Sequence, residues 1–311
     1  MHKGLACLLF LLFVVFSLSL PAAAEKPAGK VQVFVSILPV AYFVERVGGP
    51  NVDVSVLVGP GQDPHTFEPT PKLMAKLADA RVLFKLGFPF EETLIKKVGS
   101  TFKNVQVIDL QQGIQLRTFA ENKSETEDAE HGHGHAEKHG HSHGAGDPDP
   151  HTWLDPRFAK IQAGTIADTL VRIDPVHQKD YEKNLRDFLN DLDAVHGRLT
   201  GALASVKGKS FFVFHPAYGY FGAAYGLKQI PVQIEGKEAT ARQLTRLIEL
   251  AKEDEVRVIF VQPQFSRKTA EALAAAIGGA VVPLDDLAPD YLKNLQDMAT
   301  KLESALQTQK K

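Results

Sequence analysis

Residues 31–49 read VQVFVSILPVAYFVERVGG, a run rich in β-branched residues followed at once by an amphipathic stretch that ends in a glycine pair. β-Branched residues favour strands, and apolar residues spaced three or four positions apart favour a helix. The sequence therefore predicts a strand over Val31–Ile37 and a helix over Pro39–Val47. Because strands that alternate with helices form parallel sheets covered by helices, this unit indicates an α/β fold.

The alternation of strand and helix continues on both sides of a long central helix. Before that helix, the pattern predicts strands at Val52–Val58, Val82–Leu86 and Val105–Leu110 and helices at Pro71–Asp79 and Phe90–Val98. After it, the pattern predicts strands at Phe211–Phe214, Gln229–Ile234, Val258–Val261 and Val281–Val282 and helices at Thr240–Glu253, Ser266–Ile277 and 289–307. We therefore expect two lobes, each with a parallel sheet covered by helices.

The central helix is predicted from residue 175 to residue 206. Its apolar residues, from Tyr181 to Leu199, recur at spacings of three and four. A single long helix makes a stiff connector, so we expect the lobes to tilt only slightly about it. The predicted domains are an N-terminal lobe, 25–174, a linking helix, 175–206, and a C-terminal lobe, 207–311.

The composition is that of a globular protein. Of 311 residues, 44% are hydrophobic and 23% are charged, which suits about two domains with ordinary cores. The chain has 35 Lys and Arg against 37 Asp and Glu, a formal net charge of −2. Because nucleic-acid binding usually needs a basic face, we expect no nucleic-acid partner.

The first 24 residues predict a cleaved secretory signal peptide. Lys3 gives a positive start, Leu8–Leu20 is almost wholly apolar, and Pro21–Ala24 provides the small residues of a cleavage site. Cleavage removes Cys7, the only cysteine, so the mature chain would have neither disulfides nor thiolate metal ligands. We therefore expect a soluble, monomeric periplasmic protein that does not span the membrane; an uncleaved N-terminal anchor is the alternative.

Residues 120–148 interrupt the folded pattern with acidic, small and histidine residues. Their composition predicts a mobile loop, because the apolar side chains that could anchor a fold are missing from it. Six histidines make this loop a metal-attracting tract and a candidate lower-affinity zinc site: His131, His133, His135, His139, His141 and His143.

Two nearly repeated phrases carry the first candidate metal ligands. The phrases DPHTFEP and DPHTWLDP place His65 and His151 in the same local setting. A third histidine, His215, directly follows the predicted strand Phe211–Phe214. Ligands of parallel α/β sheets bind beyond the carboxyl ends of the strands, and we expect all three histidines at equivalent strand ends.

An acidic residue of the second lobe is expected as the fourth ligand. The strand end Val281–Leu284 leads into Asp285, which is the preferred candidate, with the neighbouring Asp286, Glu68 or water as alternatives. Three imidazoles and one carboxylate suit four-coordinate Zn²⁺ better than the oxygen-rich six-coordination of Mn²⁺. Because histidine ligands must be unprotonated, zinc affinity should fall as the pH drops through the ordinary imidazole range, near ~6.5.

Five motifs extend this interpretation along the chain: GPGQDPH at 59–65, DPHTW at 149–153, FHPAYGYF at 214–221, GKE at 236–238 and VQPQF at 261–265. Together they resemble the periplasmic zinc-binding receptors of high-affinity zinc ABC importers (ZnuA-type, cluster A-I or cluster 9 metal-binding solute receptors). The resemblance covers essentially the whole mature chain. It implies two α/β lobes, a rigid linking helix, and a metal in the interlobe cleft bound by His65, His151 and His215. The fourth ligand varies in this family between an acidic side chain and water, and manganese receptors carry Glu where this chain has His215.

The predicted function is that of a periplasmic solute-binding protein, not an enzyme. It would capture Zn(II) as its transported ligand and deliver it to an inner-membrane ABC permease with its ATPase. A manganese or iron receptor of the same family is the first alternative. A zinc hydrolase is a second, and it would need a general base beside the metal; Glu68 and Asp155 lie near ligands in sequence, although loop structure or ligand orientation is the simpler interpretation of both. An adhesin is a further alternative that no motif specifically demands.

Overall fold

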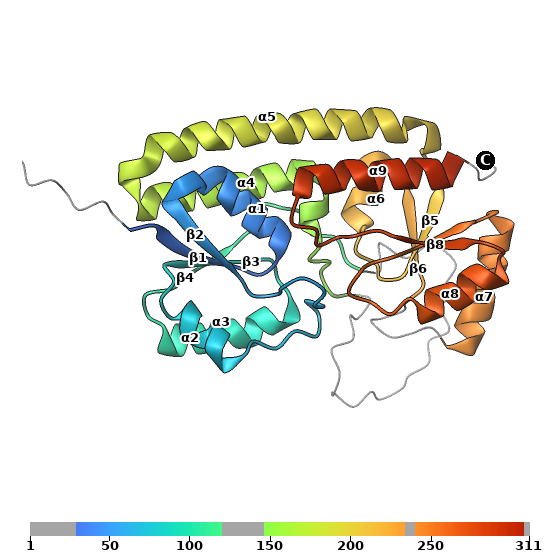
Figure 1. Cartoon of the computed structure of the whole chain (residues 1–311), viewed down its shortest axis with the longest axis horizontal. Helices are drawn as coiled ribbons and strands as arrows, with labels where there is room; N and C mark the ends of the chain where they lie inside the picture. The colour runs from blue at the N-terminus through green and yellow to red at the C-terminus, as the bar shows by residue number, and fades with distance from the viewer. Residues whose placement is uncertain (1–28, 120–145, 234–239, 308–311) are drawn as a thin grey trace, which may run out of the picture.

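The computed structural model describes residues 29–119, 146–233 and 240–307. The predicted signal peptide and the six loop histidines lie outside these ranges. Two four-stranded parallel sheets lie side by side, and one long helix runs along both (Figure 1). The prediction of two α/β lobes joined by a long helix is therefore confirmed.

The N-terminal sheet has the strand order β2-β1-β3-β4. Its strands are β1 (Val31–Val35), β2 (Val52–Val56), β3 (Val82–Lys85) and β4 (Gln106–Asp109). Helices α2 (Pro71–Leu77) and α3 (Pro89–Thr101) lie on one face of the sheet, and α1 (Leu38–Gly48) and α4 (Pro156–Ile173) lie on the other (Figure 1). The central strands β1 and β3 are almost wholly buried, as expected for parallel strands that helices cover on both faces.

The C-terminal sheet, with the order β6-β5-β7-β8, repeats the topology of the first. Its strands are β5 (Ser210–Val213), β6 (Lys228–Pro231), β7 (Val258–Val261) and β8 (Ala280–Pro283). Helices α7 (Ala241–Glu253) and α8 (Lys268–Ala276) cover one face, while α6 (Gly219–Tyr225) and α9 (Tyr291–Gln307) lie on the side of the long helix (Figure 1).

The linking helix α5 spans Gln178–Leu203 and is extended by one 3₁₀ turn at each end, Pro175–His177 and Ala204–Val206. Its buried stripe packs on α1, α4 and α9, so it contacts both lobes along its length. Residues of both sheets and of α5 belong to one continuous hydrophobic core. The two lobes are therefore packed together as well as tethered.

Two helices among the described residues were not predicted from the sequence. Helix α4 runs for 18 residues from Pro156, and α6 for 7 residues from Gly219. The start of α4 carries a clear signal, because the Asp155 side chain accepts a hydrogen bond from the Arg157 N–H and proline stands at the first helical position. Helix α6 is buried and apolar on most sides, so it has no alternation of polar and apolar residues to detect.

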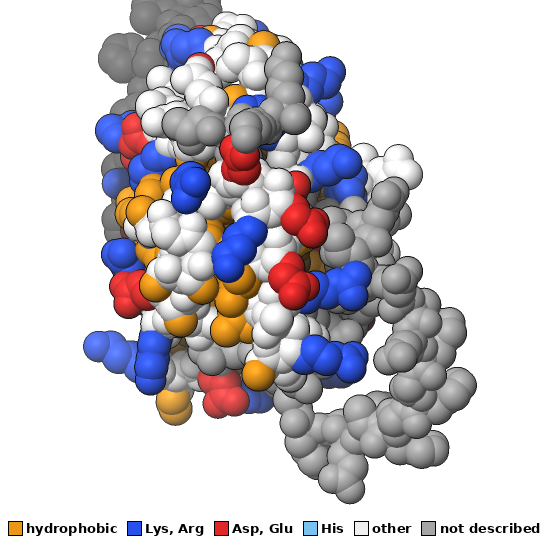
Figure 2. All heavy atoms as spheres, turned by 90° about the vertical axis from the view of Figure 1, so that its right-hand side faces the viewer, with side chains coloured by type: hydrophobic (Ala, Val, Ile, Leu, Met, Phe, Trp, Pro, Cys, Tyr) orange, Lys and Arg blue, Asp and Glu red, His pale blue; other side chains and the backbone are white. Residues whose placement is uncertain are grey.

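The surface at the C-terminal end of the molecule carries charges of both signs. Figure 2 shows Lys and Arg side chains interspersed with Asp and Glu on this face. Such a mixed surface lacks the basic stripe of a nucleic-acid interface. None of the helices in the described part of the chain has the length and apolar character that crossing a membrane requires.

Candidate metal centre

Three histidines from distant parts of the chain meet between the two lobes. The Nε2 atoms of His65 and His215 are 3.1 Å apart, those of His65 and His151 are 3.3 Å apart, and those of His151 and His215 are 3.4 Å apart. Their exposed fractions are only 7%, 1% and 2% for His65, His151 and His215. The sequence prediction that these three side chains come together is thus matched by the geometry.

The triangle has the dimensions of a tetrahedral zinc site. Two nitrogens that bind Zn²⁺ at 2.0–2.1 Å with tetrahedral angles lie about 3.3 Å apart. The three observed separations of 3.1–3.4 Å bracket that value. The donor set therefore fits a zinc ion as the captured ligand without rearrangement of the imidazoles.

Contrary to the prediction from the sequence, the three histidines do not stand at equivalent strand ends. His65 follows β2, an edge strand, and His215 follows β5, an inner strand. Within the described residues, His151 follows no strand of either sheet; the segment before it forms an isolated antiparallel bridge between Thr118 and Pro148. The repeated motif singled out a histidine that lies beside the other two, whereas the strand-end argument was wrong for it.

The repeated Asp-Pro-His phrase has a local structural reason. In each copy the aspartate Oδ1 accepts a hydrogen bond from the histidine backbone N–H, at 2.9 Å from Asp63 to His65 and at 2.9 Å from Asp149 to His151. This Asx turn fixes the histidine backbone relative to the preceding proline. The repeated sequence thus encodes a repeated way of presenting an imidazole.

Asp149 has a second role that was not predicted from the sequence. It is fully buried, and its Oδ1 lies 2.6 Å from Nδ1 of His151. A ligating histidine commonly donates its remaining N–H to a carboxylate, which fixes the tautomer and the ring orientation. Asp149 therefore directs the Nε2 lone pair of His151 toward the other two histidines.

His215 is oriented by two glutamines. Its Nδ1 lies 2.9 Å from Oε1 of Gln233. Its backbone is held on both sides by the buried Gln262, which accepts from the His215 N–H at 3.2 Å and donates to the His215 carbonyl at 2.7 Å. The motif that contains Gln262 thus positions a metal ligand without supplying one.

The two candidate carboxylates lie in different settings. Among the described residues, the group whose ligand atoms all lie within 4.8 Å of one another consists of the three histidines, without Asp285. Asp285 Oδ1 accepts from the Leu287 N–H at 2.8 Å, and burial raises the pKa of its carboxyl. Asp286 is 2% exposed and accepts from Gln264 at 2.9 Å; burial raises its pKa to about 6, partly opposed by its attraction to His151.

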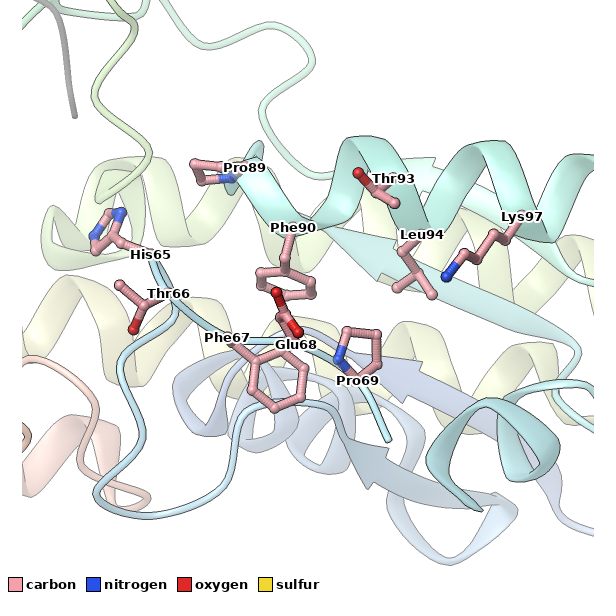
Figure 3. Close-up of a pocket in the computed structure, with 10 residues that line it drawn as sticks. All are labelled: His65, Thr66, Phe67, Glu68, Pro69, Pro89, Phe90, Thr93, Leu94 and Lys97. Atoms are coloured by element: carbon pink, nitrogen blue, oxygen red, sulfur yellow. The ribbon is translucent and has the colours of Figure 1, made fainter. Parts of the chain in front are cut away.

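Glu68 and Asp155, the other acidic residues near the ligands in sequence, point elsewhere. Glu68 lines a pocket of about 290 Å³ between its own loop and α3. Figure 3 shows its carboxylate beside the Phe90 ring, while the His65 imidazole points away from the middle of the pocket. Asp155 caps α4 and forms an ion pair with Arg157 at 2.6 Å. Neither arrangement is that of a base poised beside a metal.

Hydrogen bonds to backbone carbonyls join the lobes around the histidines. Trp153 Nε1 donates to the carbonyl of Asp286 at 2.8 Å, and the Tyr291 hydroxyl donates to the carbonyl of Trp153 at 2.5 Å. The Tyr220 hydroxyl donates to the carbonyl of Asp149 at 3.0 Å. These buried contacts fix the spacing of the lobes at the site.

A buried carboxylate, Glu91, shapes the wall behind His65. It accepts hydrogen bonds from the Ser36 hydroxyl and from the N–H groups of three successive residues, Leu86, Gly87 and Phe88. The loop so fixed holds the fully buried Phe88 ring edge-on to the His65 imidazole, with ring centroids 5.4 Å apart. Burial raises the pKa of Glu91, and these hydrogen bonds lower it again in part.

The family described as "Zinc-uptake complex component A periplasmic", ZnuA, matches residues 33–305. The chain belongs to the ZnuA family. A high-affinity zinc uptake system protein ZnuA from Bacillus subtilis (strain 168) is 34% identical over 276 residues, which cover 86% of this chain and 82% of that protein. A zinc-binding protein AdcA from Streptococcus pyogenes serotype M3 is 30% identical over 99% of this chain, which spans 61% of the length of AdcA.

A solved structure of a ZnuA protein matches most of this chain. A crystal structure of a ZnuA deletion mutant with zinc bound has a TM-score of 0.78 and 38% identity, and the match covers 89% of this chain and 98% of that one. The names of these relatives describe zinc uptake and zinc binding, not catalysis. The predictions of family and of a receptor that is not an enzyme are therefore confirmed.

We predict that Asp149→Asn lowers the affinity for Zn²⁺ by about 10–100-fold, as expected when a carboxylate behind a ligating histidine is lost. Asparagine keeps an oxygen that accepts from the backbone N–H of His151, but it holds the imidazole ring more weakly than the carboxylate does. Calorimetric titration of metal-free protein measures the effect. The matched control is Asp53→Asn, an exposed carboxylate on β2; equal affinities in the two variants would contradict the assigned role.

We also predict that Glu91→Gln lowers the free energy of unfolding by about 1–3 kcal/mol, because the amide cannot satisfy all of the buried donors that the carboxylate accepts. Urea unfolding at neutral pH measures this loss. Glu92→Gln, an exposed neighbour in the first turn of the same helix, should change it by no more than about 0.5 kcal/mol. A Glu91→Gln protein as stable as the control would refute the prediction.

Proposed function

We propose that this ZnuA-family chain is a periplasmic solute-binding protein that captures Zn(II) between its lobes and delivers it to an ABC-type metal importer. The observation that carries the proposal is the triangle of His65, His151 and His215, whose Nε2 atoms lie 3.1–3.4 Å apart. That geometry matches three corners of a zinc tetrahedron. Zinc binding by the ZnuA and AdcA relatives supports the choice of ion.

For the fourth corner, the proposed ligand remains Asp285, with Asp286 as the neighbouring alternative. Both carboxylates follow β8 in the C-terminal lobe, so either would add a negative charge to three neutral imidazoles. Zn²⁺ accepts such a His₃-carboxylate set as readily as it accepts water in the fourth position. The charge would also offset the cost of burying a divalent cation at this depth.

Capture and delivery require only binding and release. The interlobe hydrogen bonds of Trp153, Tyr220 and Tyr291 hold the histidines together before the ion arrives, so little closure is needed. The long helix α5 packs along both lobes, which favours small tilts over wide opening. The proposed partner is an inner-membrane permease with its ATPase, and the proposed acting form is a monomer.

The segments outside the described residues complete the proposal. Residues 1–24 would direct export and be removed, leaving the protein free in the periplasm. The six histidines from His131 to His143 would gather zinc at lower affinity than the interlobe site, since a histidine-rich tract attracts metal without a preformed geometry.

We predict one tight Zn²⁺ site in a calorimetric titration of metal-free protein, weakened more than ~100-fold by His65→Ala, since loss of a ligand should exceed loss of its outer partner. His196→Ala is the control, because this half-buried histidine bonds to Tyr225 far from the triad. Replacing the six tract histidines by asparagine should leave the tight site intact and remove the weaker ones. Tight binding that disappears only with the tract would refute the interlobe site.

We predict further that Asp285→Asn weakens zinc binding more than Asp286→Asn does. Asparagine retains an oxygen for the Leu287 N–H, so the change removes the charge and preserves the turn. Zinc titrations of both variants beside the wild type measure the difference. A larger loss of zinc affinity in Asp286→Asn would identify Asp286 as the fourth ligand. Unchanged affinity in both variants would assign the fourth position to water.

A further inference from the structure

The imidazole of His215 has an aromatic neighbour that no metal-ligand argument requires. The Phe265 ring stacks on it, with centroids 5.0 Å apart and planes inclined by 29°. Phe265 also contacts the Phe214 ring at 5.5 Å. It thus covers one face of a metal ligand from the loop that follows β7, a strand that supplies none of the three histidines.

The other two histidines are backed in the same way from the N-terminal lobe. Phe88 lies edge-on to His65, and the Trp153 ring lies 5.2 Å from the His151 ring. Phe88 and Trp153 are themselves in contact, 5.9 Å apart, and both are fully buried. We call Phe88, Trp153 and Phe265 the apolar wall of the site.

The loop that carries Phe265 is fixed at several points. Gln262 brackets the His215 backbone, Gln264 donates to Asp286 at 2.9 Å, and the Phe265 N–H donates to the Gln262 carbonyl at 3.1 Å. The Phe265 ring is therefore held against His215 by its own loop. Phe265 is half-buried, whereas Phe88 and Trp153 are fully buried, so it is the member of the wall that borders solvent.

An apolar wall affects which ions a site accepts. Zn²⁺ is satisfied by four ligands in a tetrahedron, whereas Mn²⁺ favours six, largely oxygen, and would have to recruit water at this site. The apolar shell around a metal controls the access of solvent to it. Aromatic rings behind the ligands offer no hydrogen-bond partner to an added water molecule.

We propose that Phe265 is a specificity-determining residue, which excludes water beside His215 and so holds the bound ion to four-coordination, favouring zinc over manganese. The inference deepens the proposed function and rests on the interlobe zinc site. Selectivity for zinc over manganese can have two causes: the identity of the ligands, and the exclusion of further ligands. Only the second depends on Phe265.

The test replaces Phe265 in the full mature chain by Asn, which is smaller and offers hydrogen bonds to water, and by Leu, which stays apolar. Co²⁺ is the probe, because four-coordinate Co²⁺ absorbs visible light strongly and six-coordinate Co²⁺ absorbs it weakly. Competition between Zn²⁺ and Mn²⁺ gives the affinity ratio. Phe102→Asn, a half-buried phenylalanine at the end of α3, is the control for loss of a ring elsewhere.

We expect Phe265→Asn to weaken the Co²⁺ absorption and to lower the ratio of Zn²⁺ to Mn²⁺ affinity by at least about tenfold. Phe265→Leu and Phe102→Asn should keep the wild-type spectrum and ratio. If circular dichroism shows that Phe265→Asn does not fold, Phe265→Ala replaces it, because alanine opens the same space without adding a polar group.

A wild-type spectrum and ratio in folded Phe265→Asn would overturn the inference, as would a Leu variant that behaves like the Asn variant. Failure of the proposed function gives a different result, because Co²⁺ and Zn²⁺ would then bind the wild type and His65→Ala equally well. Zinc binding that depends on His65 but not on Phe265 would support the interlobe zinc site and contradict only the proposed role of the apolar wall.

Discussion

The convergence of three imidazole nitrogens to within 3.4 Å of one another is the constraint on which the rest of this structure depends. Three lone pairs at such distances repel one another unless a cation or protons lie between them. The chain must therefore hold His65, His151 and His215 in place by other forces. Burial, Asx turns, side-chain hydrogen bonds and interlobe contacts all act on these residues, and each fixes a different degree of freedom of a ring.

The two lobes contribute unequally to this arrangement although their sheets have the same strand order. The N-terminal lobe presents two histidines through the same Asp-Pro-His turn, backed by fully buried rings and by Glu91. The C-terminal lobe presents one histidine on a strand end, clamped by Gln262. A repeated fold is thus used asymmetrically, and the asymmetry lies in the loops.

Much of the fold was predictable, because apolar runs and glycine or proline breaks mark β1, α1 and β7 clearly; the predicted bounds of β7 agree with the structure. The meeting of His65 and His151 was predictable from one repeated phrase, and that of His215 from its place directly after a predicted strand. The role of Asp149 was not, since an aspartate before proline has a sufficient reason in the turn alone. The fourth ligand is equally hidden from the sequence, because Asp285 and Asp286 differ in side-chain direction, which depends on the packing around them.

The shared hydrophobic core has a consequence for how the molecule loses its structure. Residues of both sheets, α5 and α9 pack in one continuous cluster, while the C-terminal lobe has a second, smaller cluster of its own beneath α7 and α8. Separately expressed halves would expose that common surface, and heat or denaturant should melt the two halves in one cooperative transition. An ion bound at the junction would then raise the melting temperature of the entire chain, because ligand binding stabilises whatever unit unfolds together.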